Sequence, residues 1–174
     1  MKIKTAKNTF QQGDVIGRKI QTLPDLTGAR ITRSHLVLAH GESGHSHVID
    51  DDEAMRDSLA FLLQSAKVGA RTYDTASAFL EMLNQISGGC VVTDVRMPGM
   101  SGIELIRKLH ELNVTLPVIV ITGHGDVPMA VEAMKSGAHD FIEKPFDDEV
   151  LLSSVRSALS VQAADRERSA ARAA

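Results

Sequence analysis

Short apolar runs alternate with helical patterns along the chain from Val48 onward. The run at 117–122, PVIVIT, is apolar and β-branched almost throughout, as expected of a strand buried on both faces of a parallel sheet. Four further runs are shorter and lie at positions 48–49, 70–73, 90–92 and 140–142. The pattern therefore predicts five strands.

The segments between these runs have the spacing of amphipathic helices. The segment at 53–66 gathers four apolar side chains on one stripe, namely Met55, Leu59, Leu62 and Leu63. Similar patterns occupy 76–86, 102–112, 127–138 and 147–159, and Gly137 is a typical glycine for the end of a helix. The alternation of five strands with five helices predicts an α/β fold with a doubly wound, five-stranded parallel sheet.

The two ends of the chain have other patterns. Positions 14–20 and 34–40 read as two strands separated by the turn-rich PDLTG, which predicts a small N-terminal β extension. No helix-turn-helix pattern is present there. We expect an extension of unknown role at 1–47, the α/β domain at 48–160 and a C-terminal linker or tail at 161–174.

Composition narrows the class of protein. The chain has 174 residues, of which 43% are hydrophobic and 24% charged, the balance of a globular domain. A formal net charge of -3 does not favour general binding to nucleic acid or to an anionic membrane. A single cysteine, Cys90, lies in an apolar run and fits a core position in a reducing compartment. We therefore expect a cytoplasmic protein that does not span a membrane.

Carboxylates follow two of the predicted strands. Asp50 and Asp51 end the first strand and Asp94 ends the third. In a flavodoxin-like sheet of order 2-1-3-4-5 these strands are neighbours at the point where strand order reverses. Three converging carboxylates raise one another's pKa unless a cation is present, and an all-oxygen set suits Mg²⁺. The simpler reading is helix capping, and Asp52 fits a cap alone.

Two further polar side chains reach the same edge of the sheet. Thr122 ends the fourth strand and Lys144 follows the fifth. A carboxylate nucleophile, a divalent ion, a lysine and a hydroxyl together indicate a phosphoryl-transfer site.

Three ordered blocks of sequence carry a resemblance to a known family: VIDDDEAMRDSL, VVTDVRMPGMSGIEL and VITGHGDVPMAVEAMKSGAHDFIEKPF. The chain from about position 48 to 159 resembles a CheY-like response-regulator receiver domain, most closely of the FixJ type. The resemblance implies two-component signal transduction, with a histidine kinase as phosphoryl donor. It also implies that the chain is not an enzyme beyond its own phosphorylation and slow autodephosphorylation.

The resemblance assigns roles at the carboxylate cluster. Asp94 would be the phospho-acceptor, and Asp50 and Asp51 would form the acid pocket. Asp51 would bind Mg²⁺ directly and Asp50 partly through water, while the backbone carbonyl of Arg96 would complete the protein's share of the ion's ligands.

The resemblance also assigns the parts of a switch. Thr122 would hydrogen-bond the phosphoryl group, and Lys144 would pair with Asp94, followed by a cis peptide bond to Pro145. Phe141 would be the switch aromatic, although a plain core phenylalanine is the simpler reading. The surface that changes would comprise the fourth helix, fifth strand and fifth helix, and would serve dimerisation or partner binding.

Four histidines crowd the region before the acid pocket: His35, His40, His45 and His47. The spacing H-x4-H-x-H of the last three matches no zinc pattern. We expect them to be solvated loop histidines.

Two alternatives remain open at this point. A haloacid-dehalogenase-type phosphatase also forms an aspartyl-phosphate on a parallel sheet, but carries its nucleophile at the end of the first strand. An inactive receiver-like binding module is the other. FixJ-type regulators carry a C-terminal DNA-binding domain that this sequence does not show, so direct DNA binding is not expected. A stand-alone receiver, an isolated receiver and a fusion are equally compatible with the sequence.

Overall fold

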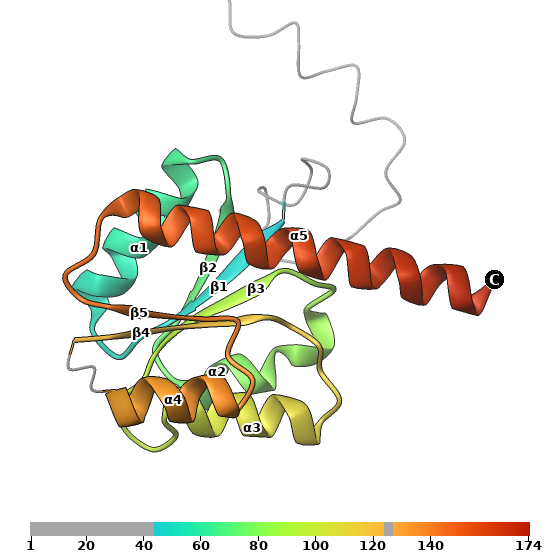
Figure 1. Ribbon diagram of the computed structural model, residues 1–174. Helices are drawn as coiled ribbons and strands as arrows, with labels where there is room; N and C mark the ends of the chain where they lie inside the picture. Colours follow the sequence, from blue (N-terminus) through green and yellow to red (C-terminus); the bar gives the residue numbers. More distant parts are fainter. Residues whose placement is uncertain (1–43, 124–126) are drawn as a thin grey trace, which may run out of the picture. The chain divides into compact units, whose positions relative to one another are not determined.

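A computed structural model describes residues 44–123 and 127–174 (Figure 1). Its centre is an all-parallel sheet with the strand order β2-β1-β3-β4-β5. The strands are β1 (His45–Ile49), β2 (Gly69–Tyr73), β3 (Cys90–Asp94), β4 (Val118–Thr122) and β5 (Asp140–Glu143). The predicted doubly wound fold and its strand order are confirmed. The predicted β extension lies outside the described residues.

Within the described residues, four helices and one short 3-10 turn connect the strands, and a fifth helix follows β5. They are α1 (Glu53–Ser65), α2 (Ala76–Glu81), η2 (Leu83–Gln85), α3 (Gly102–Glu111), α4 (Val127–Lys135) and α5 (Asp148–Ala173). Helices α1 and α5 cover one face of the sheet, and α2, α3 and α4 cover the other (Figure 1). The helix expected at 76–86 is shorter, because it ends at Glu81 and the chain continues as η2.

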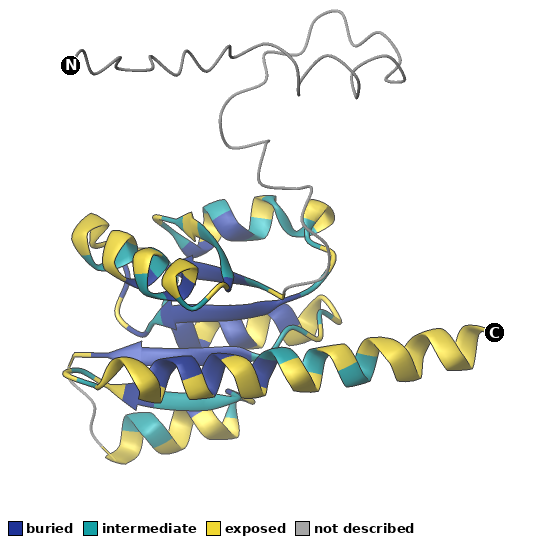
Figure 2. Cartoon of the chain, turned by 90° about the horizontal axis from the view of Figure 1, so that it is seen from above, coloured by how far each residue is buried: buried dark blue, intermediate teal, exposed yellow. Residues whose placement is uncertain are grey.

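Side chains of successive strand residues point to opposite faces and supply two apolar cores. On β1, Val48 packs with α1 and α5, whereas Ile49 packs with α2 and α3. Cys90 and Val91 on β3 divide in the same way. Figure 2 shows the sheet buried between its two helical layers. Because both faces of the sheet are covered, residues pointing to either face are apolar, and the strands therefore read as continuous apolar runs.

Polar side chains define the helix ends. Asp52 caps α1 by accepting a hydrogen bond from the Met55 amide at 3.2 Å, as expected. Ser101 and Glu104 form a reciprocal capping box at the start of α3. Gly137, at φ 97°, follows the end of α4, and its amide bonds the Met134 carbonyl at 3.1 Å.

Helix α5 continues well past the predicted boundary at position 160. It runs unbroken for 26 residues, and the part beyond Ser160 is largely exposed (Figure 2). The predicted tail is therefore helical up to Ala173. No helix in 44–123 or 127–174 is both long and apolar enough to cross a bilayer.

The expectation of solvated histidines is wrong for His47. The strand β1 begins at His45, and His47 is only 2% exposed. Its Nδ1 lies 3.2 Å from the Tyr73 hydroxyl, its Nε2 lies 3.4 Å from the Gly88 carbonyl, and its ring stands beside Phe79. Burial lowers the pKa of His47 to about 4, so the buried ring is neutral. His35 and His40 lie outside the described residues.

Candidate functional site

The two acidic strand ends lie side by side. Strand β1 pairs with β3 in parallel, and its last paired residue, Ile49, lies opposite Thr93. Asp50 follows Ile49, and Asp94, the last residue of β3, follows Thr93, so both carboxylates stand at the carboxyl edge of the sheet. Residues far apart in sequence are brought together there by strand order alone.

Lys144 joins the two carboxylates. Its Nζ lies 3.1 Å from Asp94 Oδ1 and 3.5 Å from Asp50 Oδ2. The side chains are 21% exposed for Lys144, 12% for Asp94 and 5% for Asp50. The Lys144 amide donates to the Thr122 carbonyl at 2.8 Å, and the following bond to Pro145 is cis, as expected. The predicted lysine is therefore directed at the predicted acceptor.

Burial disfavours the ionised form of the Asp50 carboxyl. Burial raises the pKa of its carboxyl and the nearby Asp94 charge adds to this, while the Asp52 amide and Lys144 oppose the rise. The Asp52 amide donates to Asp50 Oδ1 at 2.9 Å. Asp50 is thus a shielded carboxyl that a further cation would stabilise in its charged form.

Asp94 is held at its second oxygen and through its backbone. Its Oδ2 accepts a hydrogen bond from the Arg96 amide at 2.6 Å. The amide of Gly102 donates to the Val95 carbonyl at 3.0 Å, and a side chain at Gly102 would collide with the Asp94 carbonyl. The start of α3 therefore packs directly against the backbone of the predicted acceptor, which requires glycine there.

The remaining predicted site residues lie at the same edge of the sheet. Thr122 is buried at the end of β4, in register with Glu143 of β5. The side chain of Asp51 is exposed in the turn after β1. Arg96 follows β3 by two residues, and its side chain is exposed.

The donor set fits a hard divalent cation. Asp50, Asp51 and Asp94 would supply carboxylate oxygens, and the predicted Arg96 carbonyl would come from the turn after β3. Among the described residues, no three acidic, histidine or cysteine side chains form a ready cluster of metal ligands. An ion at this edge would therefore take several ligands from water and backbone, which is usual for Mg²⁺.

Phe141 of β5 packs against the core between the sheet and helices α2, α3 and α4. It lies opposite Val120 of β4 and packs, partly buried, against the core beneath α3 and α4. Helix α4 itself buries only Ala133. Its exposed apolar side chains recur at helical spacing, Val127 at 77%, Val131 at 44% and Met134 at 49% exposure. This stripe is an exposed apolar surface on α4.

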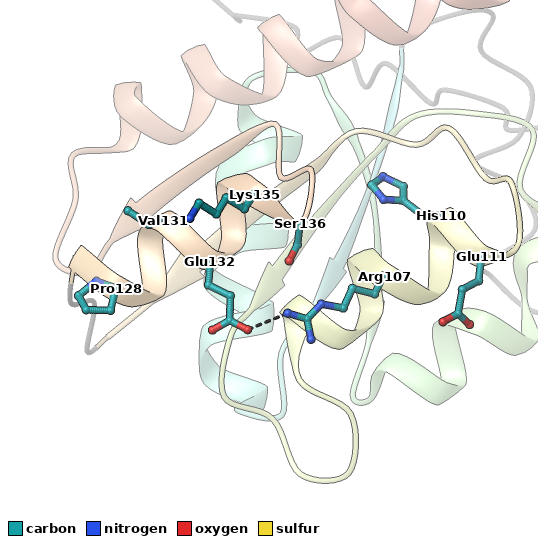
Figure 3. A pocket seen from close by; sticks show the side chains of 8 residues that line it. All are labelled: Arg107, His110, Glu111, Pro128, Val131, Glu132, Lys135 and Ser136. Carbon is teal, nitrogen blue, oxygen red and sulfur yellow. Dashed lines mark hydrogen bonds and ion pairs between the residues drawn. The ribbon is translucent and has the colours of Figure 1, made fainter.

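A groove of about 910 Å³ separates α3 from α4 (Figure 3). Arg107 of α3 spans it to Glu132 of α4 at 2.8 Å, and both side chains are 54% exposed. None of the residues at the carboxylate edge lines this groove. It is a feature of the α4 surface and separate from the candidate site.

A second groove, of about 1010 Å³, reaches the candidate site. It lies between α1 and the loop after β5, and Lys144 and Pro145 form part of its wall. Its other walls include Leu62, Phe146 and Phe61, the last 74% exposed. An apolar surface therefore adjoins Lys144 of the candidate site.

One residue beside the site was not among the predicted site residues. Arg56 of α1 donates from Nη1 to the Asp50 carbonyl at 2.8 Å. Its place one helical turn after the acidic run was the available clue, because residues one turn into a helix lie above the preceding loop.

Comparison with known proteins agrees with this geometry. Residues 47–156 match the family described as response regulator receiver domain. The transcriptional regulatory protein FixJ of Bradyrhizobium diazoefficiens is 57% identical over 116 residues, which are 67% of this chain and 57% of that protein. FixJ of Rhizobium meliloti is 53% identical over 112 residues, 64% of this chain and 55% of that protein. The chain thus spans little more than half the length of these curated relatives.

Two solved structures are similar in fold. The crystal structure of FixJ-N has a TM-score of 0.65 and 50% identity, covering 68% of this chain and 95% of that one. The solution structure of the beryllofluoride-activated NtrC4 receiver domain dimer has a TM-score of 0.63 and 34% identity, covering 67% of this chain and 96% of that one.

Proposed function

Because the chain belongs to the response regulator receiver family, we propose that it is phosphorylated on Asp94 by a histidine kinase in the presence of Mg²⁺. Its FixJ-type receiver domain is consistent with two-component signalling. Receiver domains are generally not enzymes, and Asp94 would be phosphorylated once. Water would then slowly hydrolyse the aspartyl phosphate, which releases inorganic phosphate and regenerates Asp94. The observation that carries the proposal is the contact of Lys144 with both Asp94 and Asp50 at the edge of the sheet.

The residues divide the work of phosphoryl transfer. A carboxylate oxygen of Asp94 attacks the phosphorus of the donor, and the bond from phosphorus to the donor's imidazole nitrogen breaks. Lys144, 3.1 Å from Asp94, neutralises charge that develops on the phosphoryl oxygens. Asp50, Asp51, Asp94 and the Arg96 carbonyl would hold Mg²⁺, which supplies further charge neutralisation when bound.

Phosphorylation would alter the surface formed by α4, β5 and α5. Thr122 would turn its hydroxyl toward the new phosphoryl group, and Phe141 would move into the space that becomes free. The apolar stripe of Val127, Val131 and Met134 is the part of that surface suited to a second copy of the chain. A homodimer that forms on phosphorylation follows from this proposal.

The groove beside Lys144 suits a macromolecular donor. Its apolar wall includes the exposed ring of Phe61 and extends to Lys144. A docked donor would therefore lie next to the carboxylate that receives the phosphoryl group. We expect Phe61→Ala to slow labelling by a phosphorylated histidine kinase that labels the wild type, and to leave labelling by acetyl phosphate unchanged. Equal slowing with both donors would show that Phe61 affects the phosphorylation site itself and does not bind the kinase.

The central test uses beryllofluoride, a phosphoryl mimic, with wild type and Asp94→Asn. In the wild type only, we expect Mg²⁺-dependent binding of beryllofluoride, measured by NMR. We also expect an increase in the fraction of dimer, measured by light scattering. Binding that survives Asp94→Asn unchanged would remove Asp94 from its role. Repeated turnover of a phosphomonoester such as p-nitrophenyl phosphate would favour the phosphatase alternative.

A further inference from the structure

Arg56 braces the point where the chain leaves the sheet. Its Nη1 donates a hydrogen bond to the Asp50 carbonyl at 2.8 Å. The amide of Asp50 still belongs to the sheet, because it donates to the Tyr73 carbonyl at 3.2 Å. Arg56 therefore links the first turn of α1 to the end of β1, a contact that the phosphoryl chemistry above does not use.

This contact closes a turn that carries both carboxylates of the acid pocket. The Asp52 amide bonds Asp50 Oδ1 at 2.9 Å, and the Arg56 amide bonds the Asp52 carbonyl at 3.0 Å. The residues on either side of Asp51 are thus fixed by hydrogen bonds, while the side chain of Asp51 is exposed. The backbone is ordered and one carboxylate remains accessible, as a cation site requires.

The guanidinium of Arg56 is directed at a neutral carbonyl. A charge role and a geometric role for Arg56 make opposite predictions. Removing a positive charge near the site would tighten cation binding, whereas loosening the turn would weaken it.

We propose that Arg56 is a positioning residue for the acid pocket, whose bond to the Asp50 carbonyl holds the β1–α1 turn in the arrangement that binds a divalent cation. The inference rests on the proposed function, since it concerns the same site. Loss of groups that orient metal ligands commonly weakens metal binding by about 10- to 100-fold. Arg56 supports the backbone and not a ligand atom, so the lower end, about 10-fold, is expected.

The test is calorimetric titration of Mg²⁺ into the full chain, without any phosphoryl donor. The variants are Arg56→Gln, Arg56→Lys and, as a matched control, Arg107→Gln. The control removes a guanidinium from an exposed ion pair on α3, away from the site. We expect about 10-fold weaker Mg²⁺ binding in Arg56→Gln, partial recovery in Arg56→Lys, and no change in Arg107→Gln.

Equal or tighter Mg²⁺ binding by Arg56→Gln would overturn the proposal. If that variant does not fold, amide hydrogen exchange of Arg56→Lys decides. Faster exchange at Asp52 than in the wild type supports the brace, and unchanged exchange overturns it. A wild type that binds neither Mg²⁺ nor beryllofluoride would refute the proposed function itself, whereas wild-type binding matched by Arg56→Gln would refute the positioning role alone.

Discussion

Replacing Lys144 by methionine isolates the charge at the centre of the site. Methionine retains an unbranched apolar stem and removes the ammonium that lies 3.1 Å from Asp94 and 3.5 Å from Asp50. All three side chains are at least 79% shielded from water, as their exposures of 21%, 12% and 5% show. The variant therefore leaves two shielded carboxylates without this counter-charge.

The expected cost in the free energy of unfolding lies between two known limits. Exposed ion pairs contribute about 0–1 kcal/mol, whereas removing one partner of a buried pair costs about 3–5 kcal/mol. Lys144 keeps some contact with water, which moves the value below the buried limit. We expect Lys144→Met to lower the free energy of unfolding by about 2 kcal/mol at neutral pH.

The loss of unfolding free energy caused by Lys144→Met should be larger at neutral pH than at acidic pH. Burial raises the pKa of Asp50, and Lys144 opposes that rise, so the pKa of Asp50 is higher still in the variant. The contribution of Asp50 to stability is present below its ordinary pKa and is lost as pH rises through the folded-state value. The difference between wild type and variant is therefore largest where Asp50 is ionised, and it shrinks as Asp50 becomes protonated.

Urea unfolding followed by far-ultraviolet circular dichroism measures this difference, at about pH 7 and about pH 4. Lys108→Met is the control, because Lys108 is 46% exposed and pairs with Glu111 at i,i+3. The control should cost no more than about 0.5 kcal/mol. A cost for Lys144→Met equal to the control, or equal at both pH values, would refute the view that its ammonium balances the two carboxylates.

Three further predictions concern the surroundings of the site. Because burial depresses the pKa of His47 to about 4, its neutral ring contributes stability above about pH 6.5 that is lost on acidification, about 3 kcal/mol in all. Urea titrations of His47→Gln should show a flatter acid limb, and a limb as steep as that of the wild type would contradict this. Phe79→Ala should lower the free energy of unfolding by about 3–5 kcal/mol, because the ring is fully buried. A loss near 1 kcal/mol in the same urea titration would argue against tight packing around this ring. Gly102→Ala should weaken beryllofluoride binding because its methyl group meets the Asp94 carbonyl, whereas Gly123→Ala, where nothing lies within 4 Å, should bind as the wild type does.

The fold and the place of Lys144 at the same edge of the sheet as Asp94 were predictable because a parallel sheet obeys simple rules. Apolar runs that alternate with helical stripes define the strand number, and strand order makes the ends of β1 and β3 neighbours. Asp50 and Asp94 are thereby brought together although 43 residues separate them in the sequence. Backbone pairing alone determines this proximity, so it follows from sequence patterns.

The features that escaped prediction depend on side-chain partners from other elements. The glycines before His47 favour a solvated loop, yet Tyr73, Phe79 and the Gly88 carbonyl surround the ring in the fold. Arg56 read as one polar position of an amphipathic helix, and only the path of β1 shows which carbonyl it reaches. Neither contact has a periodicity that a single sequence displays.

The proposed switch needs an element that can move at low cost, and burial identifies it. Helix α3 buries five residues, including Ile103, Leu105 and Leu109, whereas α4 buries only Ala133. Moving α4 therefore exposes far less apolar surface than moving α3. The Lys144 amide donates to the Thr122 carbonyl, and Phe141 lies three residues before Lys144, on β5. In the proposed switch, a change at the site would therefore reach α4 through the paired strands β4 and β5. A rearrangement confined to β4, β5 and α4 leaves the carboxylates on β1 and β3 in place, which allows the site to hold the phosphoryl group while the α4 surface changes.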